Sequence, residues 1–299
     1  MLSKIKSLIP AFIKDPINKI RNNRRWKRQY NSIINFYDNK ANLTNEEIEV
    51  INYLKKIKGL IVFPYEYTSS WDFMSVKVFL DNISGLSYVL HYGKRLYFKR
   101  EMSEIEIKGV YFGLLNEQSP KSPHLYLTDF FTVENNSVVA DFGAAEGIFS
   151  LNVIDHVSKI YLFEPDPSWI EALYLTFRPW NQKVIIVNKF IGKSLNESTE
   201  TVDHYFSNIQ LDFIKADIEG SEGDMLEGAY ETLALNKKMK LVITTYHKQF
   251  DFEEISNTLT KNFNFYIEHS YGFMLYYINN NLKPPYLRRG ILRAVKNIN

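Results

Sequence analysis

The sequence contains no cysteine among its 299 residues. Disulfide bonds, thiolate metal sites and cysteine nucleophiles are therefore excluded together. No apolar run reaches the roughly 18 residues that a membrane-spanning helix needs, and the N-terminus lacks the apolar stretch and cleavage site of a signal peptide. We therefore expect a cytoplasmic protein. With 45% hydrophobic and 23% charged residues, the composition is that of a globular chain.

The small net charge of +2 hides an uneven distribution. Residues 1–28 hold nine lysines and arginines against Asp15 alone, and the rest of the chain is net negative. Apolar residues recur at helical spacing among these charges, which is typical of an amphipathic basic helix. Two interpretations of this arm, residues 1–36, stay open: an apolar face that packs on the body, or attraction to an anionic membrane. Without an RNA-binding motif, the basic run does not favour nucleic acid.

The region from residue 37 to residue 125 has a mixed pattern. Thr44–Glu47 form a capping box before a helix, short strands are indicated at 86–92 and 96–99, and a helix is indicated over 103–118. We expect an N-terminal α+β cap region that selects the substrate.

From residue 126 to residue 281 strands and helices alternate regularly. The expected strands lie at 138–141, 159–163, 184–187, 212–216 and 240–245. This alternation predicts a Rossmann-like, doubly wound α/β domain with a mostly parallel sheet. Strands at 264–269 and 273–278 around a Tyr271-Gly272 turn predict an antiparallel C-terminal hairpin, followed by a basic tail over 282–299.

The clearest functional signal is a strand that ends in an acid and enters a glycine turn. It reads Val138-Val139-Ala140-Asp141-Phe142-Gly143-Ala144-Ala145-Glu146-Gly147. Open α/β sheets bind ligands at such strand ends. The dinucleotide fingerprint G-x-G-x-x-G is not present, and Asp141 and Glu146 would repel a diphosphate. An acidic turn favours a cationic ligand, and S-adenosylmethionine (SAM), with its ammonium and sulfonium groups, is one.

The second strand also ends in acids, at Phe163-Glu164-Pro165-Asp166. A carboxylate here accepts hydrogen bonds from two ribose hydroxyls, so Glu164 alone does not distinguish SAM from NAD. Asp166 is better explained as the N-cap of the next helix. After the third strand, we expect Asn188 and Lys189 beside the adenine.

Two further strand ends carry candidate catalytic groups. The fourth strand leads into Asp217-Ile218-Glu219-Gly220-Ser221-Glu222, where Asp217 and Glu219 would point the same way. They could orient hydroxyls or bind the SAM amino group, or they could complement the dipole of the next helix. Glu222 is expected only as an acid at the helix start. The fifth strand ends near His247, which can accept a proton from a substrate hydroxyl.

Together these segments resemble the FkbM-type SAM-dependent methyltransferases, over roughly residues 117–278. The resemblance rests on the glycine turn, the Glu164 segment and the D-x-E-G-x-E pattern of Asp217–Glu222. It implies a class I methyltransferase sheet of seven strands and an O-methyltransferase acting on sugar or polyketide hydroxyls. It also implies Asp141, Gly143, Ala145 and Gly147 around the methionine part of SAM, Glu164 on the ribose, and Asp217 and Glu219 on the substrate side.

We therefore expect an enzyme that transfers the SAM methyl group to a hydroxyl of a saccharide or lipid-linked glycan. The expected catalytic residues are His247, Asp217 and Glu219. The expected cofactor contacts are Asp141, Gly143, Ala144, Ala145, Glu146, Gly147, Glu164, Pro165, Asn188, Lys189 and Asp217. Two carboxylates are too few to predict a metal site. A nitrogen acceptor, a SAM-binding module without catalysis and a nicotinamide oxidoreductase stay open as alternatives.

Overall fold

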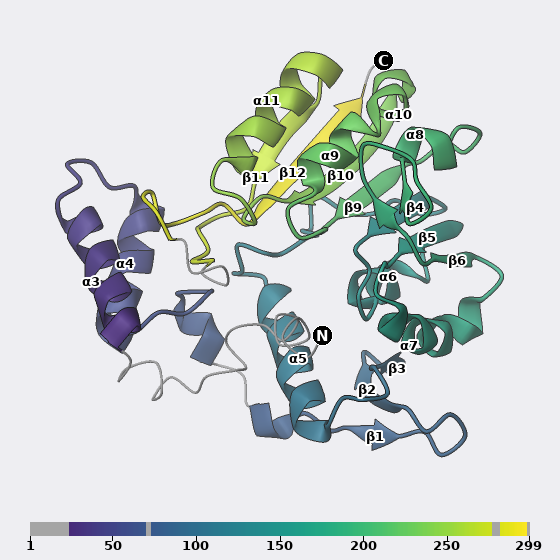
Figure 1. Ribbon diagram of the computed structural model, residues 1–299, viewed down its shortest axis with the longest axis horizontal. Helices are drawn as coiled ribbons and strands as arrows, with labels where there is room; N and C mark the ends of the chain where they lie inside the picture. The colour runs from purple at the N-terminus through teal and green to yellow at the C-terminus, as the bar shows by residue number, and fades with distance from the viewer. Residues whose placement is uncertain (1–23, 70–72, 277–281, 298–299) are drawn as a thin grey trace. The chain divides into compact units, whose positions relative to one another are not determined.

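The chain divides into two compact units, each made of segments that are distant in sequence (Figure 1). The computed structural model describes residues 24–69, 73–276 and 282–297. Unit 1 comprises Met1–Val76, Ile105–Leu125 and Ser270–Gly290, and unit 2 comprises Lys77–Glu104, Tyr126–His269 and Ile291–Asn299. Within the described ranges, every helix is too short or too polar to cross a lipid bilayer.

Unit 2 is built on a sheet of seven strands. In chain order they are β4 (Val138–Phe142), β5 (Lys159–Phe163), β6 (Val184–Val187), β9 (Phe213–Ala216), β10 (Lys238–Thr244), β11 (Tyr266–His269) and β12 (Ile291–Asn297). Their order across the sheet is β11-β12-β10-β9-β4-β5-β6. The five neighbouring strands β10, β9, β4, β5 and β6 are parallel, and β12 is antiparallel to both of its neighbours, β10 and β11. This is the class I methyltransferase arrangement that the resemblance implies.

The direction of chain travel across this sheet reverses between β4 and β9. From β4 the chain moves outward through β5 and β6, and it then returns to β9 on the other side of β4. A crevice for a ligand forms at the carboxyl ends of two strands at such a reversal. The fold therefore brings the glycine turn after β4 next to the acidic segment after β9.

Helices cover the sheet because its central strands are apolar on both faces. All four residues of β9 are buried, as are Leu241, Val242 and Ile243 of β10, which is typical of parallel strands with helices on both sides. The helices of unit 2 are α6 (Ile148–Val153), α7 (Pro167–Phe177), α8 (Val202–Tyr205), α9 (Glu222–Glu227), α10 (Tyr230–Leu235) and α11 (Asp251–Phe263). As predicted, Asp166 caps α7, accepting a hydrogen bond from the backbone of Ser168.

The antiparallel partner of β11 comes from a different segment than the sequence predicted. β11 pairs with β12, which begins at Ile291. Met274 lies in unit 1, where it forms an isolated bridge with Arg288, and residues 277 and 278 lie outside the described residues. The predicted antiparallel C-terminal pair is therefore present, but its second strand is β12 and not residues 273–278, and part of the expected tail is a strand of the sheet. Residues 273–278 are uniformly apolar, whereas the segment of β12 contains Arg293 and Lys296, so the local pattern favoured the wrong segment.

A small antiparallel sheet from the expected cap region belongs to unit 2. It contains β1 (Phe79–Leu80), β2 (Ser87–His91) and β3 (Lys94–Tyr97). The backbone N–H of Tyr97 donates a 3.0 Å hydrogen bond to the hydroxyl of Thr176 on α7. A parallel pair of short strands, β7 (Phe190–Ile191) and β8 (Thr199–Glu200), completes the unit.

Unit 1 is mainly helical. Its elements are α3 (Arg24–Asp38), α4 (Asn45–Ile57), α5 (Glu104–Glu117) and two short 3₁₀ turns, η2 (Glu66–Ser69) and η3 (Phe73–Ser75). The predicted capping box opens α4, with Thr44 and Glu47 each accepting a hydrogen bond from the other's backbone. Ile33 of α3 and Leu54 of α4 are fully buried. α3 includes the last residues of the expected arm, whereas the apolar residues at helical spacing that predicted an amphipathic helix lie in residues 1–23, outside the described residues.

Candidate active site

The glycine turn after β4 is held in an unusual backbone conformation. Gly143, Ala145 and Gly147 have positive φ angles of 75°, 48° and 87°. The backbone N–H groups of Gly143 and Ala144 both donate to the carbonyl oxygen of Phe163, at the end of β5. Gly143 and Ala145 are partly exposed, whereas Ala144, Glu146 and Gly147 are buried. The turn therefore offers its backbone at two points to a ligand in the crevice.

Only glycine fits at position 143. A Cβ built there would lie 2.0 Å from the carbonyl oxygen of Asp217, and the positive φ already disfavours a side chain. The backbone of the glycine turn and the segment after β9 are thus in direct contact, as the order of the strands requires.

Asp141 lies beneath the turn and is fully buried. Its Oδ1 is 3.0 Å from Nζ of Lys215, and its Oδ2 accepts a 2.6 Å hydrogen bond from Ser150. Lys215 also donates to the carbonyl oxygen of Gly143 at 2.7 Å. Although burial opposes the charged amine, Asp141 raises the pKa of Lys215 above its ordinary value, so the amine stays charged. Asp141 therefore supports the turn from below, and its contact with the cofactor stays a prediction.

The negative charge expected at the turn is smaller than the sequence suggested. Lys215 balances the charge of Asp141, and Glu146 is only 5% exposed. The turn thus presents mainly backbone groups to a ligand, and its electrostatic preference for a cation is weaker than the two acids alone would imply.

Glu164 is placed as a ribose acceptor should be. Its carboxylate accepts 2.8 Å hydrogen bonds from the backbone N–H groups of Ala145 and Asp166. Burial raises the pKa of Glu164. Because each carboxylate oxygen has two lone pairs, the group can still accept hydrogen bonds from hydroxyls. Glu164 therefore has the capacity to accept from hydroxyls, and its contact with the ribose of SAM stays a prediction.

The other expected adenosine contacts lie around the ends of β5 and β6. Pro165 is partly buried between the two acids of its segment. Asn188 donates a 2.7 Å hydrogen bond to the carbonyl oxygen of Glu164 and so ties the two strand ends together. Lys189 is 3.4 Å from a carboxylate oxygen of Glu200. Contacts of these side chains with adenine stay a prediction.

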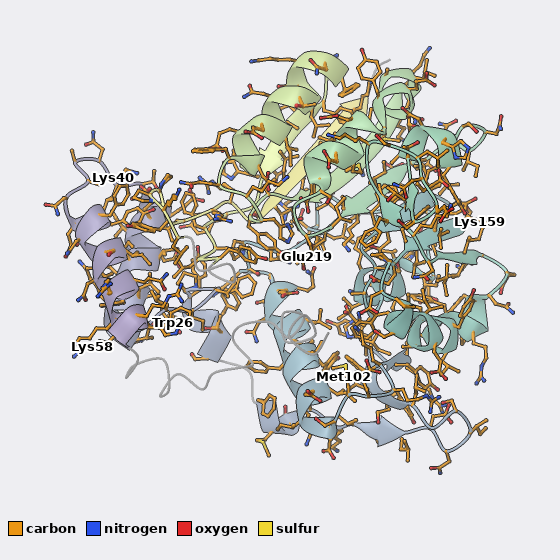
Figure 2. The ribbon with its side chains drawn as sticks, in the orientation of Figure 1. Trp26, Lys40, Lys58, Met102, Lys159 and Glu219 are labelled. Carbon is orange, nitrogen blue, oxygen red and sulfur yellow. The ribbon has the colours of Figure 1, made fainter. Side chains whose placement is uncertain are left out.

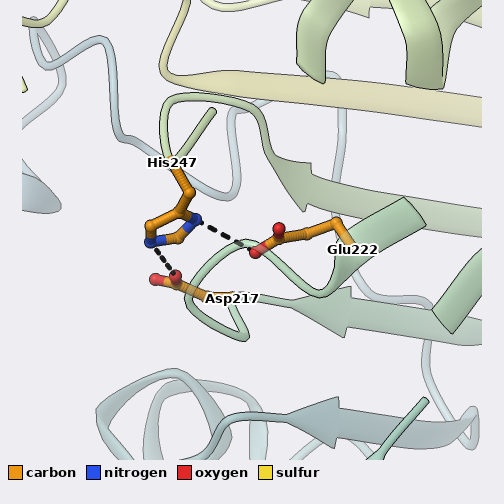
Figure 3. A group of neighbouring side chains, drawn as sticks. All are labelled: Asp217, Glu222 and His247. Carbon is orange, nitrogen blue, oxygen red and sulfur yellow. Dashed lines mark ion pairs between the residues drawn. The ribbon is translucent and has the colours of Figure 1, made fainter. Parts of the chain in front are cut away.

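A histidine between carboxylates lies at the ends of β9 and β10 (Figure 3). Nδ1 of His247 is 3.0 Å from Oε1 of Glu222, and its Nε2 is 3.6 Å from Oδ1 of Asp217 and 3.7 Å from Oε2 of Glu219. The hydroxyl of Tyr126 donates a 2.7 Å hydrogen bond to Asp217. The predicted catalytic residues His247, Asp217 and Glu219 are therefore brought together.

The charges in this cluster stabilise one another. Burial opposes a charged imidazole, but Glu222 and Asp217 raise the pKa of His247 from 6.5 to about 9. In the same way burial favours a neutral Glu222, but His247 lowers the pKa of Glu222 below its ordinary value. Near neutral pH the cluster therefore contains an imidazolium between carboxylates.

The segment after β9 has a strained turn that presents Glu219. Glu219 has a φ angle of 56° and a side chain that is 76% exposed (Figure 2). The neighbouring Gly220 has a φ angle of 96°. Left-handed backbone at a residue with a side chain is uncommon and is frequent at functional sites. The turn directs Glu219 outward while Asp217 stays half-buried.

Three side chains of this cluster have donor atoms close enough for a metal ion. One atom each from Asp217, Glu222 and His247 lies within 4.8 Å of the others. However, Glu222 faces Nδ1 of the ring and Asp217 faces Nε2. A single ion cannot bind both ring nitrogens, so this arrangement fits an imidazolium with two carboxylate partners better than a three-ligand metal site.

Three residues of the site, Lys215, Glu222 and Tyr126, were not predicted from the sequence. Two of them carried a signal: Lys215 lies inside an apolar strand, where a charge needs a partner, and Glu222 is the last acid of the D-x-E-G-x-E pattern. Tyr126 precedes the first strand of the sheet, and no local pattern marks it.

Comparison with known proteins identifies one family. Residues 174–281 match the family model described as the methyltransferase FkbM domain. The match covers roughly a third of the chain and includes Asp217, Glu219, Glu222 and His247, while the glycine turn and Glu164 precede it. No curated protein matches the sequence.

Similar solved structures are methyltransferases of distant sequence. An rRNA methylase from Streptococcus thermophilus is 12% identical over 56% of this chain and 90% of that chain, with a TM-score of 0.38. Precorrin-6y C5,15-methyltransferase from Geobacter metallireducens is 12% identical over 55% and 82%, with a TM-score of 0.37. Magnesium protoporphyrin IX methyltransferase from Synechocystis, with bound SAM, is 14% identical over 55% and 71%, with a TM-score of 0.35.

The family match and the sheet topology agree. The matched segment contains four strands of the class I methyltransferase sheet, β6, β9, β10 and β11. It also contains the histidine and carboxylates at the carboxyl edge of that sheet. The sheet thus has the strand order of class I methyltransferases, and residues 174–281 of the chain match the methyltransferase FkbM domain.

Proposed function

We propose that the enzyme methylates a hydroxyl group of a saccharide or a lipid-linked glycan. The observation that carries this proposal is the placement of His247 beside Asp217 and Glu219 at the carboxyl edge of the sheet. A hydroxyl needs a base to remove its proton, and carboxylates accept hydrogen bonds from further hydroxyls of a polyol. Tyr126 adds an aromatic ring beside Asp217. This set of groups suits a polar acceptor rich in hydroxyls.

The cofactor would be held at the neighbouring strand ends. Gly143 and Ala145, whose N–H groups donate to Phe163 and Glu164, would offer their carbonyl oxygens to its methionine part. Glu164 would accept hydrogen bonds from its ribose. When bound, SAM supplies a methyl group that its sulfonium already activates. The protein's own contribution is then to align the acceptor and to take its proton.

We assign the proton acceptor to Nε2 of His247, with Asp217 as the second candidate. Nδ1 is occupied by Glu222, whereas Nε2 faces Asp217 and Glu219. With a pKa of about 9, His247 is mostly protonated at pH 7. Its small neutral fraction is a stronger base than an ordinary histidine, and the rate should rise with pH up to about 9.

The acceptor can be tested directly. Glycan extracts from cells with and without the protein are compared by mass spectrometry, and the purified enzyme is incubated with SAM and the same extracts. We expect a glycan one methylene heavier and formation of S-adenosylhomocysteine. A methylated amine as the only product, or binding of SAM without turnover on any glycan fraction, would overturn the proposal.

We also propose that unit 1 contacts an anionic membrane surface through α3 and the end of α4. These elements surround a hollow of about 720 Å³ lined by Trp26, Lys27, Tyr30, Asn31, Lys55, Lys56, Lys58, Gly59 and Leu60. Trp26 and Lys58 are labelled in Figure 2. Lys55 and Lys56 have carboxylate partners, but within the described ranges no ion pair involves Lys27 or Lys58. Aromatic rings beside such lysines suit a lipid–water interface.

Sedimentation with lipid vesicles tests this contact. The protein should pellet with phosphatidylserine-containing vesicles and much less with pure phosphatidylcholine, and salt should weaken binding. Lys27→Glu with Lys58→Glu should reduce binding at least about tenfold, since each basic residue near the surface contributes roughly 1 kcal/mol. Lys159→Glu with Lys261→Glu, the same charge change in unit 2, is the control. Equal losses in both double variants would contradict the proposal.

A further inference from the structure

Glu222 is more than an acid at the start of a helix. It is the first residue of α9, yet it is only 1% exposed. Burying a carboxylate costs several kcal/mol unless partners compensate. A side chain that only complemented the helix dipole would stay in water, so the inward orientation of Glu222 needs another explanation.

One carboxylate oxygen of Glu222 contacts groups that belong to two different segments. Oε1 lies 3.0 Å from Nδ1 of His247 and accepts a 3.0 Å hydrogen bond from the hydroxyl of Thr244, both on the β10 side. It also accepts hydrogen bonds from the backbone N–H groups of Ile218 (3.0 Å) and Gly220 (3.4 Å), on the β9 side. Glu222 thus joins the strand end that carries His247 to the turn that carries Glu219.

The same contact decides which ring nitrogen of His247 carries the proton. Because a carboxylate only accepts hydrogen bonds, Nδ1 must be the N–H donor toward Glu222. When the ring is neutral, the lone pair is therefore on Nε2, the nitrogen that faces Asp217 and Glu219. A carboxylate that fixes the tautomer and orientation of a histidine is a recurring device in enzymes.

We propose that Glu222 is a positioning residue that holds His247 with Nε2 as its reactive nitrogen and that shapes the turn bearing Glu219. The part of this inference that concerns catalysis rests on the proposed function, in which His247 takes the acceptor's proton. The part that concerns the ring does not, because the tautomer is a property of the protein alone.

Other charged groups also face the ring and enter the test. Asp217 and Glu219 lie on the segment after β9, and Asp251, at the start of α11, is coupled electrostatically to both His247 and Glu222. Lys248 is the next residue in the chain, and its backbone donates to Asp251. Glu222 lies 3.0 Å from Nδ1, closer than the hydroxyl of Thr244 at 3.5 Å, so its removal should be the change that frees the tautomer.

The first experiment uses the wild-type protein. Nitrogen NMR of the ¹⁵N-labelled protein, with His247→Gln to assign the signals, reports the protonation of each ring nitrogen through a pH titration. We expect the neutral ring to carry its proton on Nδ1. A neutral ring with the proton on Nε2 would overturn the proposal without any variant at position 222.

The second experiment removes the charge of Glu222 while keeping an acceptor oxygen. In Glu222→Gln the pKa of His247 should fall by at least about two units, because the ring loses its nearest anion. In assays with the acceptor, the limiting kcat at high pH should fall at least about tenfold, and the rising limb of its pH profile should move to lower pH. The affinity for SAM and the KM for the acceptor should stay within a few-fold.

The control is Glu227→Gln, at the other end of α9, where the carboxylate is 67% exposed. It should leave the pKa of His247 and kcat unchanged. An unchanged pKa of His247 in a folded Glu222→Gln protein would overturn the proposal. If the NMR results are as expected but no hydroxyl is methylated, the proposed function fails and the positioning of the ring by Glu222 stands.

Discussion

At the scale of single residues, His247 is the group on which the proposed chemistry depends. His247→Ala should lower kcat by at least about 10², because a positioned base contributes 10² to 10⁴ in rate. The affinity for SAM should stay within a few-fold, since Glu164 and the glycine turn lie on other strand ends. Steady-state kinetics and calorimetric titration with SAM measure the two quantities. Unchanged turnover would remove His247 from the mechanism and leave Asp217 as the candidate base.

The buried pair of Asp141 and Lys215 makes a second prediction at this scale. Lys215→Met should lower the free energy of unfolding by about 3–5 kcal/mol, because it leaves the carboxylate of Asp141 buried without its cation. The double variant with Asp141→Asn should be more stable than Lys215→Met alone, since no unpaired charge is left. Urea unfolding of the three proteins measures the difference. A double variant that loses as much free energy of unfolding as Lys215→Met, or more, would show that the two side chains are not coupled.

At the scale of elements, the contact between the glycine turn and the segment after β9 can be tested with two glycines. Gly143→Ala should weaken SAM binding at least about tenfold, because its Cβ would lie 2.0 Å from the carbonyl oxygen of Asp217. Gly223→Ala in α9 has no heavy atom within 4 Å of its Cβ and should leave SAM binding unchanged. Calorimetric titration measures both. Equal affinities in the two variants would contradict the close contact.

Helices and strands could be predicted from the sequence where interactions between neighbouring residues determine them. The strand over 159–163 and the N-cap at Asp166 were placed correctly because β-branched and aromatic runs and a capping acid act on neighbouring residues. The hairpin over 273–278 was wrong because strand pairing is decided by segments far apart in sequence. Residues 273–278 are uniformly apolar and Ile291–Asn297 contains Arg293 and Lys296, yet the tertiary fold places the second segment in the sheet.

The sequence predicted where the candidate site lies better than it predicted the contacts of its side chains. Strand ends identified Asp217, Glu219 and His247, because parallel strands bring their carboxyl ends to one edge. The roles of Asp141 and Glu222 depended on partners that the local pattern does not reveal, namely Lys215 and His247. A charged residue that a sequence motif places at the surface can thus be buried, because a partner of opposite charge lies beside it in the fold.

At the scale of the whole molecule, the imidazolium of His247 links stability to pH. The pKa of His247 is about 9 in the folded protein against 6.5 in the unfolded chain. A raised folded pKa contributes stability that is complete below pH 6.5 and is lost as the pH rises from 6.5 through 9. The lowered pKa of Glu222 acts in the opposite sense, with stability complete above 4.5 and lost as the pH falls further.

The protein should therefore lose stability between pH 6.5 and pH 9, by on the order of 3 kcal/mol from this one group. Urea unfolding at a series of pH values measures the slope for the wild type and for His247→Gln. The variant cannot bind a proton at this position, so its slope over the same window should be smaller by the contribution of His247. Parallel slopes in the two proteins would mean that His247 is not held as an imidazolium, and the cluster would then have to be stabilised by neutral hydrogen bonds alone.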